Sequence, residues 1–76
     1  MHAYAFGSAD AAVQSARQSI DSAIEILERE RDRLIPLVVE GPPHLRSLRL
    51  RQLKSIERQL AAAQAKQAKL PRELHH

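Results

Sequence analysis

Glu40-Gly41-Pro42-Pro43 is the strongest turn signal in this 76-residue chain, because glycine ends helices and a pair of prolines cannot continue one. The charge of the chain changes sign at the same point. Residues 1–40 carry four basic and seven acidic side chains, whereas residues 41–76 carry eight basic and two acidic ones. Two segments of opposite net charge, −3 and +6, favour packing against each other or against another copy.

The segment before the turn has the apolar spacing of an amphipathic helix. Apolar side chains recur every three or four residues, with one acidic interruption at Glu30, and this period predicts a helix over residues 9–39. The stripe consists of Val13, Ala16, Ile20, Ala23, Leu27, Leu34 and Leu37, and is widened by Ile24 and Val38. Its breadth is typical of a helix in a bundle.

Both ends of this first helix carry their own signals. Residues 1–8 are expected to form a flexible N-terminus, and Ser8 or Asp10 offers a side-chain oxygen that can cap the first turn. Pro36 removes one backbone hydrogen bond, so we expect a kink near residue 36 rather than a break, because the apolar stripe continues beyond it. Gly41 then suits the C-terminal cap.

The segment after the turn predicts a second helix over residues 44–70, begun by Pro42 or Pro43 and ended by Pro71. Residues 71–76 are expected to be a frayed tail. The apolar arc of this helix consists of Leu45, Leu48, Leu53, Ile56, Leu60, Ala63 and Leu70.

A turn as short as residues 40–43 between two long helices predicts an all-α, single-domain antiparallel hairpin. Folding about Gly41 brings together residues whose numbers sum to about 83, which sets Leu27 beside Ile56. A hairpin alone leaves much of each apolar stripe in water, and the chain has no cysteine for a disulfide. We therefore expect completion as a dimeric four-helix bundle or by another helical protein.

The layout of an acidic helix, a Gly-Pro-Pro turn and a basic helix resembles two known families. One comprises plasmid copy-number regulators that form dimeric hairpin bundles and bind RNA. The other comprises the small hairpin chaperones of type III secretion needle subunits. The resemblance is one of layout only and implies a helical hairpin, without carrying over a function.

Composition argues against catalysis. Aromatic residues make up 3% of the chain, so neither a stacking platform for single-stranded nucleic acid nor an apolar substrate pocket is expected. No metal or cofactor site is expected, since cysteine is absent and the histidines lie far apart or at the ends, at His2, His44, His75 and His76. The sequence predicts no enzyme and no small-molecule substrate.

The same composition bears on location. No apolar run approaches the roughly 18 residues that a membrane span requires. Met1–Gly7 lacks the basic and apolar regions of a secretory signal. A cytoplasmic protein is expected. Tyr4 and Phe6 would either fold over the end of the bundle or anchor a partner.

Arg49 lies near the centre of the second apolar arc, and Arg31 lies at the edge of the first. One interpretation is that their aliphatic stems pack while the guanidinium groups reach water. A second is a semi-buried ion pair with Glu30 or Asp32, which would set register and partner choice. A third is a ligand-binding arginine.

The most basic stretch begins the second helix and has two interpretations. The cations could complement the acidic first helix, within one chain or between chains. Alternatively, they could contact phosphates of RNA or DNA. The candidate contacts are Arg46, Arg51, Lys54 and Arg58.

These observations favour a non-enzymatic protein-interaction module: an adaptor, a small chaperone-like protein or an assembly subunit. It would bind itself, as a homodimer, or another helical protein through coiled-coil packing. The expected interface residues are Val13, Ile20, Ile24, Leu27, Leu34, Val38, Leu53, Ile56 and Leu60. The alternative is a dimeric bundle that binds nucleic acid through the basic second helix.

Overall fold

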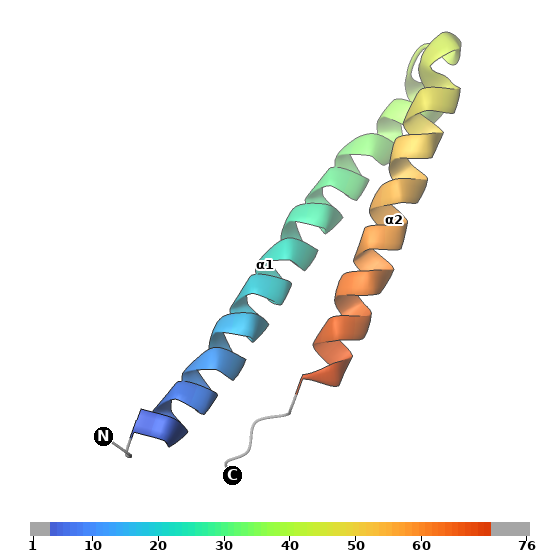
Figure 1. The fold of residues 1–76 in the computed structure, drawn as a ribbon. Helices are drawn as coiled ribbons and strands as arrows, with labels where there is room; N and C mark the ends of the chain where they lie inside the picture. Colours follow the sequence, from blue (N-terminus) through green and yellow to red (C-terminus); the bar gives the residue numbers. More distant parts are fainter. Residues whose placement is uncertain (1–3, 71–76) are drawn as a thin grey trace.

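The computed structural model describes residues 4–70, with side chains described from Asp10 onward. Helix α1 spans Tyr4–Glu40, the 3₁₀ turn η1 spans Pro43–Leu45, and α2 spans Arg46–Lys69. Figure 1 shows the helices side by side and antiparallel, joined at one end by the short connection. The predicted all-α hairpin is therefore confirmed for the described residues. The expected tail, residues 71–76, lies outside them.

Helix α1 begins earlier than the sequence suggested. Its first residue is Tyr4, and the helix continues through Ser8 and Asp10, so neither residue starts it. The surrounding alanines explain the extension, because alanine has the highest helix propensity and Ser or Asp can be accommodated within such a run. The segment expected to be flexible, residues 1–8, is therefore helical from Tyr4.

The end of α1 differs from the expected glycine cap. The helix passes through Pro36 and ends at Glu40. The N–H of Gly41 then donates to the carbonyl oxygen of Leu37 at 2.9 Å, a further helical hydrogen bond, and Gly41 does not adopt a positive φ. Gly41 therefore extends the helical path instead of reversing it.

Prolines shape the connection and the end of α2. Pro42 has an extended backbone (φ −59°, ψ 136°), as expected of a residue that precedes another proline, and Pro43 opens η1. The N–H of Leu45 donates to the carbonyl oxygen of Pro42 at 3.1 Å. At the other end, Leu70 is extended (φ −70°, ψ 145°) because Pro71 follows it, so α2 ends at Lys69.

Two hydrogen bonds between the helices set their register. Nε2 of Gln67 donates to Oδ1 of Asp21 at 2.8 Å, and Nη1 of Arg49 donates to the carbonyl oxygen of Leu37 at 3.5 Å. The residue numbers of these pairs sum to 88 and 86.

The expected register of about 83 is wrong because the connection is longer than four residues. The turn η1 moves the midpoint between the helices from Gly41 to Pro43. The observed register places Leu27 level with Leu60 rather than with Ile56. The apolar stripes still face each other, because a shift of three or four residues is about one helical turn.

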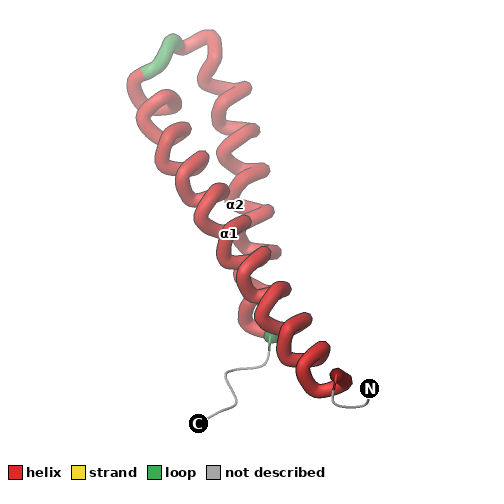
Figure 2. The backbone as a smooth tube through the Cα atoms, turned by 90° about the vertical axis from the view of Figure 1, so that its left-hand side faces the viewer, coloured by secondary structure: helices red, strands yellow, loops and turns green. Residues whose placement is uncertain are grey.

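The hairpin has a thin core. Only Leu34 and Leu60, exposed by 5% and 4%, are buried among the described residues. The radius of gyration is 18.0 Å, compared with about 11 Å for a compact domain of this length. The molecule measures 61 × 21 × 15 Å, and the first turns of α1 extend past the end of α2 (Figures 1 and 2).

Candidate protein interface

The nine expected interface residues all lie on the facing sides of the two helices, here called the seam. Leu34 and Leu60 are buried. The other seven are half-buried: Val13, Ile20, Ile24, Leu27, Val38, Leu53 and Ile56. From Ile20 onward these side chains are shielded on one side by the neighbouring helix and remain partly accessible to solvent, whereas Val13 lies on the part of α1 that extends past the end of α2. The seam is therefore a continuous apolar surface that a single hairpin covers only in part.

Five large apolar side chains outside the expected interface are exposed, by 40–67%: Ile26, Ile35, Val39, Leu48 and Leu50. Four of them lie on the turns next to the connection. The sequence placed Leu48 in the apolar arc, but its exposure of 51% corrects that assignment. The other four fall outside the three-four spacing, so a search for that period missed them. Together they widen the apolar surface beyond the seam.

Arg49 contacts the end of α1 instead of an acidic partner. Its guanidinium donates to the carbonyl oxygen of Leu37, one of the last carbonyls of the helix, where a positive charge is favoured by the helix dipole. A Cβ at residue 41 would lie 2.5 Å from Nη1 of Arg49 and against the backbone of Leu37. Glycine is therefore required at residue 41 chiefly by the Leu37 backbone, because the guanidinium is the movable end of a flexible side chain.

The three ion pairs of the described residues all lie within α1. They join Arg29 to Glu25 at 3.5 Å, Arg31 to Asp32 at 3.2 Å and Arg33 to Glu30 at 2.8 Å. Arg31 pairs with Asp32, one of the two partners considered from the sequence, and in this pair Arg31 is half-buried while Asp32 is exposed. Such exposed pairs contribute little to stability, because water screens their charges and holding two side chains together costs conformational entropy.

The cations of α2 lack acidic partners on α1. Arg46, Arg51, Lys54 and Arg58 are exposed, and none forms an ion pair within residues 4–70. Pairing of these cations with α1 of the same hairpin is therefore not observed among residues 4–70, and pairing between chains stays a prediction. Three acidic side chains of α1 pair with arginines of their own helix, whereas α2 has Glu57 as its sole acid between residues 46 and 69. These four cations remain available for an anionic partner.

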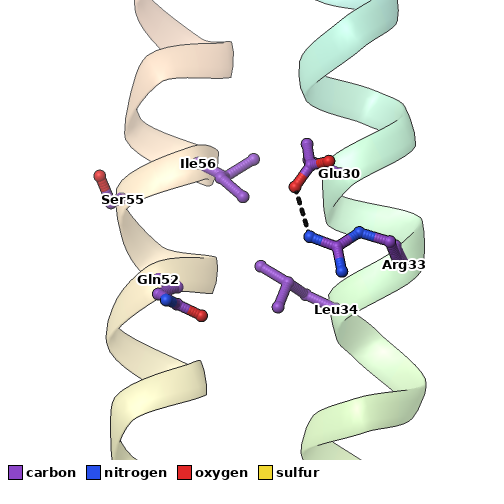
Figure 3. Close-up of a pocket in the computed structure, with 6 residues that line it drawn as sticks. All are labelled: Glu30, Arg33, Leu34, Gln52, Ser55 and Ile56. Atoms are coloured by element: carbon purple, nitrogen blue, oxygen red, sulfur yellow. Dashed lines mark hydrogen bonds and ion pairs between the residues drawn. The ribbon is translucent and has the colours of Figure 1, made fainter.

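A pocket of about 290 Å³ opens between the helices (Figure 3). Leu34 and Ile56 point toward each other at its base, and the Glu30–Arg33 ion pair borders it on α1. Gln52 and Ser55 line it on α2. A second hollow, of about 500 Å³, lies on α1 alone and is lined by Ser15, Gln18, Ser19, Ser22, Ala23 and Ile26.

The charges beside the first pocket are held in their ionised forms. The hydrogen bond and positive charge of Arg33 lower the pKa of Glu30, and the carboxylate of Glu30 raises the pKa of Arg33. Glu30 therefore supplies a negative charge at neutral pH rather than a proton. The pocket can receive an apolar side chain beside a polar border.

Within residues 4–70, no group of three or more acidic or histidine side chains is placed to hold a metal ion. Neither described helix combines the length and apolarity required to cross a bilayer. Comparison with protein-family models, curated proteins and solved structures finds no match for the chain. The functional proposal therefore rests on the geometry and chemistry of the hairpin.

Proposed function

We propose that the chain is a non-enzymatic, cytoplasmic interaction module that packs its seam against the helices of itself or of another helical protein. It would serve as an adaptor, a small chaperone-like protein or an assembly subunit. The observation that carries the proposal is the burial pattern: nine apolar side chains form one seam, and only Leu34 and Leu60 are buried.

The energetics of a hairpin this thin support a partner. Burial of apolar surface stabilises by about 25 cal/mol per Å², and most seam side chains obtain only part of that contribution in one hairpin. Isolated helices are marginal in water, and most helix stability comes from tertiary packing. A further helix on the seam would complete the burial. The partner would therefore stabilise the fold as it binds.

Aspartate substitutions in the seam test this proposal. Leu27→Asp or Ile56→Asp would bury an uncompensated charge, so each should abolish association and most helicity, measured by light scattering and circular dichroism. Ile26→Asp is the matched control, because Ile26 is 57% exposed on the same helix as Leu27. Unchanged mass and helicity in both seam variants would contradict the proposal.

The unpaired cations of α2 favour a second candidate function, the binding of RNA or DNA. Arg51, Lys54 and Arg58 recur at spacings of three and four residues and thus share one side of α2. Phosphate contacts need exposed cations of this kind and do not require aromatic stacking. Arg46 lies one and a half turns before Arg51 and would make a separate contact.

Titration with duplex DNA and with unstructured RNA at two salt concentrations tests this candidate. The variant Arg51→Gln/Lys54→Gln/Arg58→Gln should lower both the affinity and its salt dependence, by about one unit of salt slope for each phosphate that is no longer neutralised. Lys66→Gln/Lys69→Gln is the control, since these cations lie at the other end of α2. No binding by the unmodified chain at low salt would eliminate the candidate.

A further inference from the structure

We infer that the partner of the seam is a second copy of this chain, packed so that α1 of each hairpin lies against α2 of the other and both turns lie at the same end. This inference rests on the proposed function and names the occupant of the surface that the hairpin leaves open. Three properties of the chain support it: its exposed area, the distribution of apolar and polar side chains between its two sides, and the charges of its two helices.

The exposed area matches what a dimer would cover. The chain exposes 6154 Å², whereas a compact monomer of 8.6 kDa exposes about 4,700 Å². The excess is roughly 1,450 Å². A standard interface covers about 800 Å² of each partner, and homodimers often cover about 1,000–2,500 Å². One further copy of this small chain is large enough to cover the excess.

On one side of the hairpin, exposed apolar residues of the two helices lie at nearly the same level. On a wheel of about 100° per residue, Ile35 lies about 100° from Leu34, and Leu50 lies about 80° from Leu60. Because the two helices run antiparallel, a positive angle on either helical wheel points to the same side of the hairpin. Ile35 and Leu50, exposed by 43% and 40%, therefore open on one side, here called the apolar side, which the half-buried Ile24 also borders.

The opposite side, here called the polar side, is less suited to helix packing. The pocket bordered by the Glu30–Arg33 ion pair and by Gln52 and Ser55 lies there. Its exposed large apolar residues are Ile26 on α1 and Leu48 on α2, but their numbers sum to 74, so they lie at different levels and do not form one patch as Ile35 and Leu50 do. A helical partner that buries apolar surface would therefore cover the apolar side.

The charges select the arrangement of the two copies. Helix α1 has net charge −3 and α2 has +6 over their described spans. Packing α1 on the partner's α1 would bring like charges together, whereas packing α1 on the partner's α2 alternates the sign around the bundle. The alternating arrangement requires a two-fold axis parallel to the helices, which keeps both turns at the same end.

This symmetry pairs residues at the same level. The hairpin register places Ile35 within one to three residues of the level of Leu50, since their numbers sum to 85 against 86 and 88. The two-fold axis then sets Ile35 against Leu50 of the partner subunit, twice in the dimer. Arg31 and Glu57, whose numbers sum to 88, also share a level on the apolar side, and Glu57 has no ion pair within residues 4–70. Arg31 would meet Glu57 of the partner subunit.

Light scattering on the full chain across a hundredfold concentration range tests for the second copy. The expected mass is twice 8.6 kDa. Ile35→Glu/Leu50→Glu should raise the dissociation constant at least tenfold, whereas Ile26→Glu, on the polar side, should leave it within about twofold. A chain that remains at 8.6 kDa, or that dissociates only with Ile26→Glu, overturns the inference.

Cysteine cross-linking tests the arrangement, because the chain has no cysteine of its own. A mixture of the Ile35→Cys and Leu50→Cys chains, oxidised with glutathione disulfide, should give a disulfide-linked dimer. Neither chain alone should cross-link, and neither should Ile26→Cys mixed with Leu50→Cys. Cross-linking of Ile35→Cys with itself, or no cross-link in the first mixture, overturns the arrangement.

The two proposals fail in different ways. A monomer of low helicity would overturn the second copy but leave the interaction module in place with a different partner. A monomer that is fully helical and unfolds cooperatively at a temperature independent of concentration would overturn both, since such a hairpin would not need a partner.

Discussion

Nη1 of Arg49, on α2, lies 3.5 Å from the backbone carbonyl oxygen of Leu37, on α1, and donates a hydrogen bond to it. The same oxygen accepts the N–H of Gly41 at 2.9 Å. A cation from the second helix therefore joins the last carbonyls of the first, beside a glycine that leaves room for it. The carbonyl oxygen of Leu37 therefore takes part both in the packing of α2 on α1 and in the start of the chain reversal.

We predict that Arg49→Met, which keeps an apolar stem, lowers the free energy of unfolding by about 0.5–1.5 kcal/mol because the hydrogen bond and the helix-end charge are removed. Gly41→Ala should cost about 1–3 kcal/mol, because its Cβ would meet both Arg49 and the Leu37 backbone. Urea titrations followed by circular dichroism measure both values. The double variant should cost less than the sum of the two single costs, because Arg49→Met removes the guanidinium that a Cβ at residue 41 would otherwise meet. Full additivity would contradict the contact.

The buried leucines should carry the largest stability cost. We predict that Leu60→Ala lowers the free energy of unfolding by about 2–4 kcal/mol, through reduced burial and a residual cavity. Ile26→Ala, at a side chain 57% exposed, should cost under about 1 kcal/mol. Thermal and urea denaturation measure the difference. Equal costs at the two positions would mean that Leu60 does not belong to the core.

The register can be checked by a double-mutant cycle on Asp21 and Gln67. Each single alanine substitution should cost about 0.5–1 kcal/mol, because both remove the same hydrogen bond of 2.8 Å between exposed side chains. The double variant should cost less than the sum of the two. This hydrogen bond joins side chains of the two helices, so a shift of register would break it. A coupling energy of zero would mean that Asp21 and Gln67 do not form this hydrogen bond.

Neutralising the cations of α2 should not destabilise the hairpin. Arg51→Gln/Lys54→Gln/Arg58→Gln removes three charges that form no ion pair within residues 4–70, so we predict a change in the free energy of unfolding within about 0.5 kcal/mol. Arg33→Gln, which removes a paired cation, is the comparison. A large loss of stability in the triple variant would show that α2 uses these charges internally.

Acid should weaken the ion pair of Glu30 and Arg33. The pKa of Glu30 lies below its ordinary value of 4.5 in the folded chain, because Arg33 donates to it and stabilises its charge. Above pH 4.5 the contribution of the pair is complete. As the pH falls toward the folded-state pKa, the unfolded chain binds a proton first, so that contribution is lost.

Melting temperatures between about pH 5 and pH 3 test this effect. The unmodified chain should lose more thermal stability over that range than Glu30→Gln, which has no carboxylate to titrate at this position. The comparison isolates Glu30 from the other acidic groups, which both chains share. Parallel profiles would contradict the ion pair.

The hairpin architecture was predictable from the sequence, whereas the conformation of the connection between the helices was not. The three-four spacing identified Leu34 and Leu60 as seam residues, because apolar periodicity reflects directly which side of a helix is covered. The register was missed because a 3₁₀ turn at Pro43–Leu45 is invisible to that period. The sequence offered water, an acidic side chain or a ligand as partners of the Arg49 guanidinium, and none of these is the backbone carbonyl of Leu37 to which it donates.

Charge was the least predictable part of the surface. The net values of the two helices suggested that they neutralise each other within one hairpin. The individual acids of α1, such as Glu25 and Glu30, instead reach arginines one turn away on the same helix. Spacing within a helix decides this outcome, because residues three or four apart are already neighbours before the helices meet.

The unequal lengths of the helices imply an order of opening. Amide hydrogens in the first turns of α1, which extend past α2, have the protection of an isolated helix and should exchange with solvent through local fraying. Amides from Leu27 to Leu34, level with the most buried part of α2, should exchange only when the whole hairpin opens. Exchange protection would therefore rise along α1 from its start toward Leu34. The part of α1 that opens only with the whole hairpin would be shorter than the helix itself.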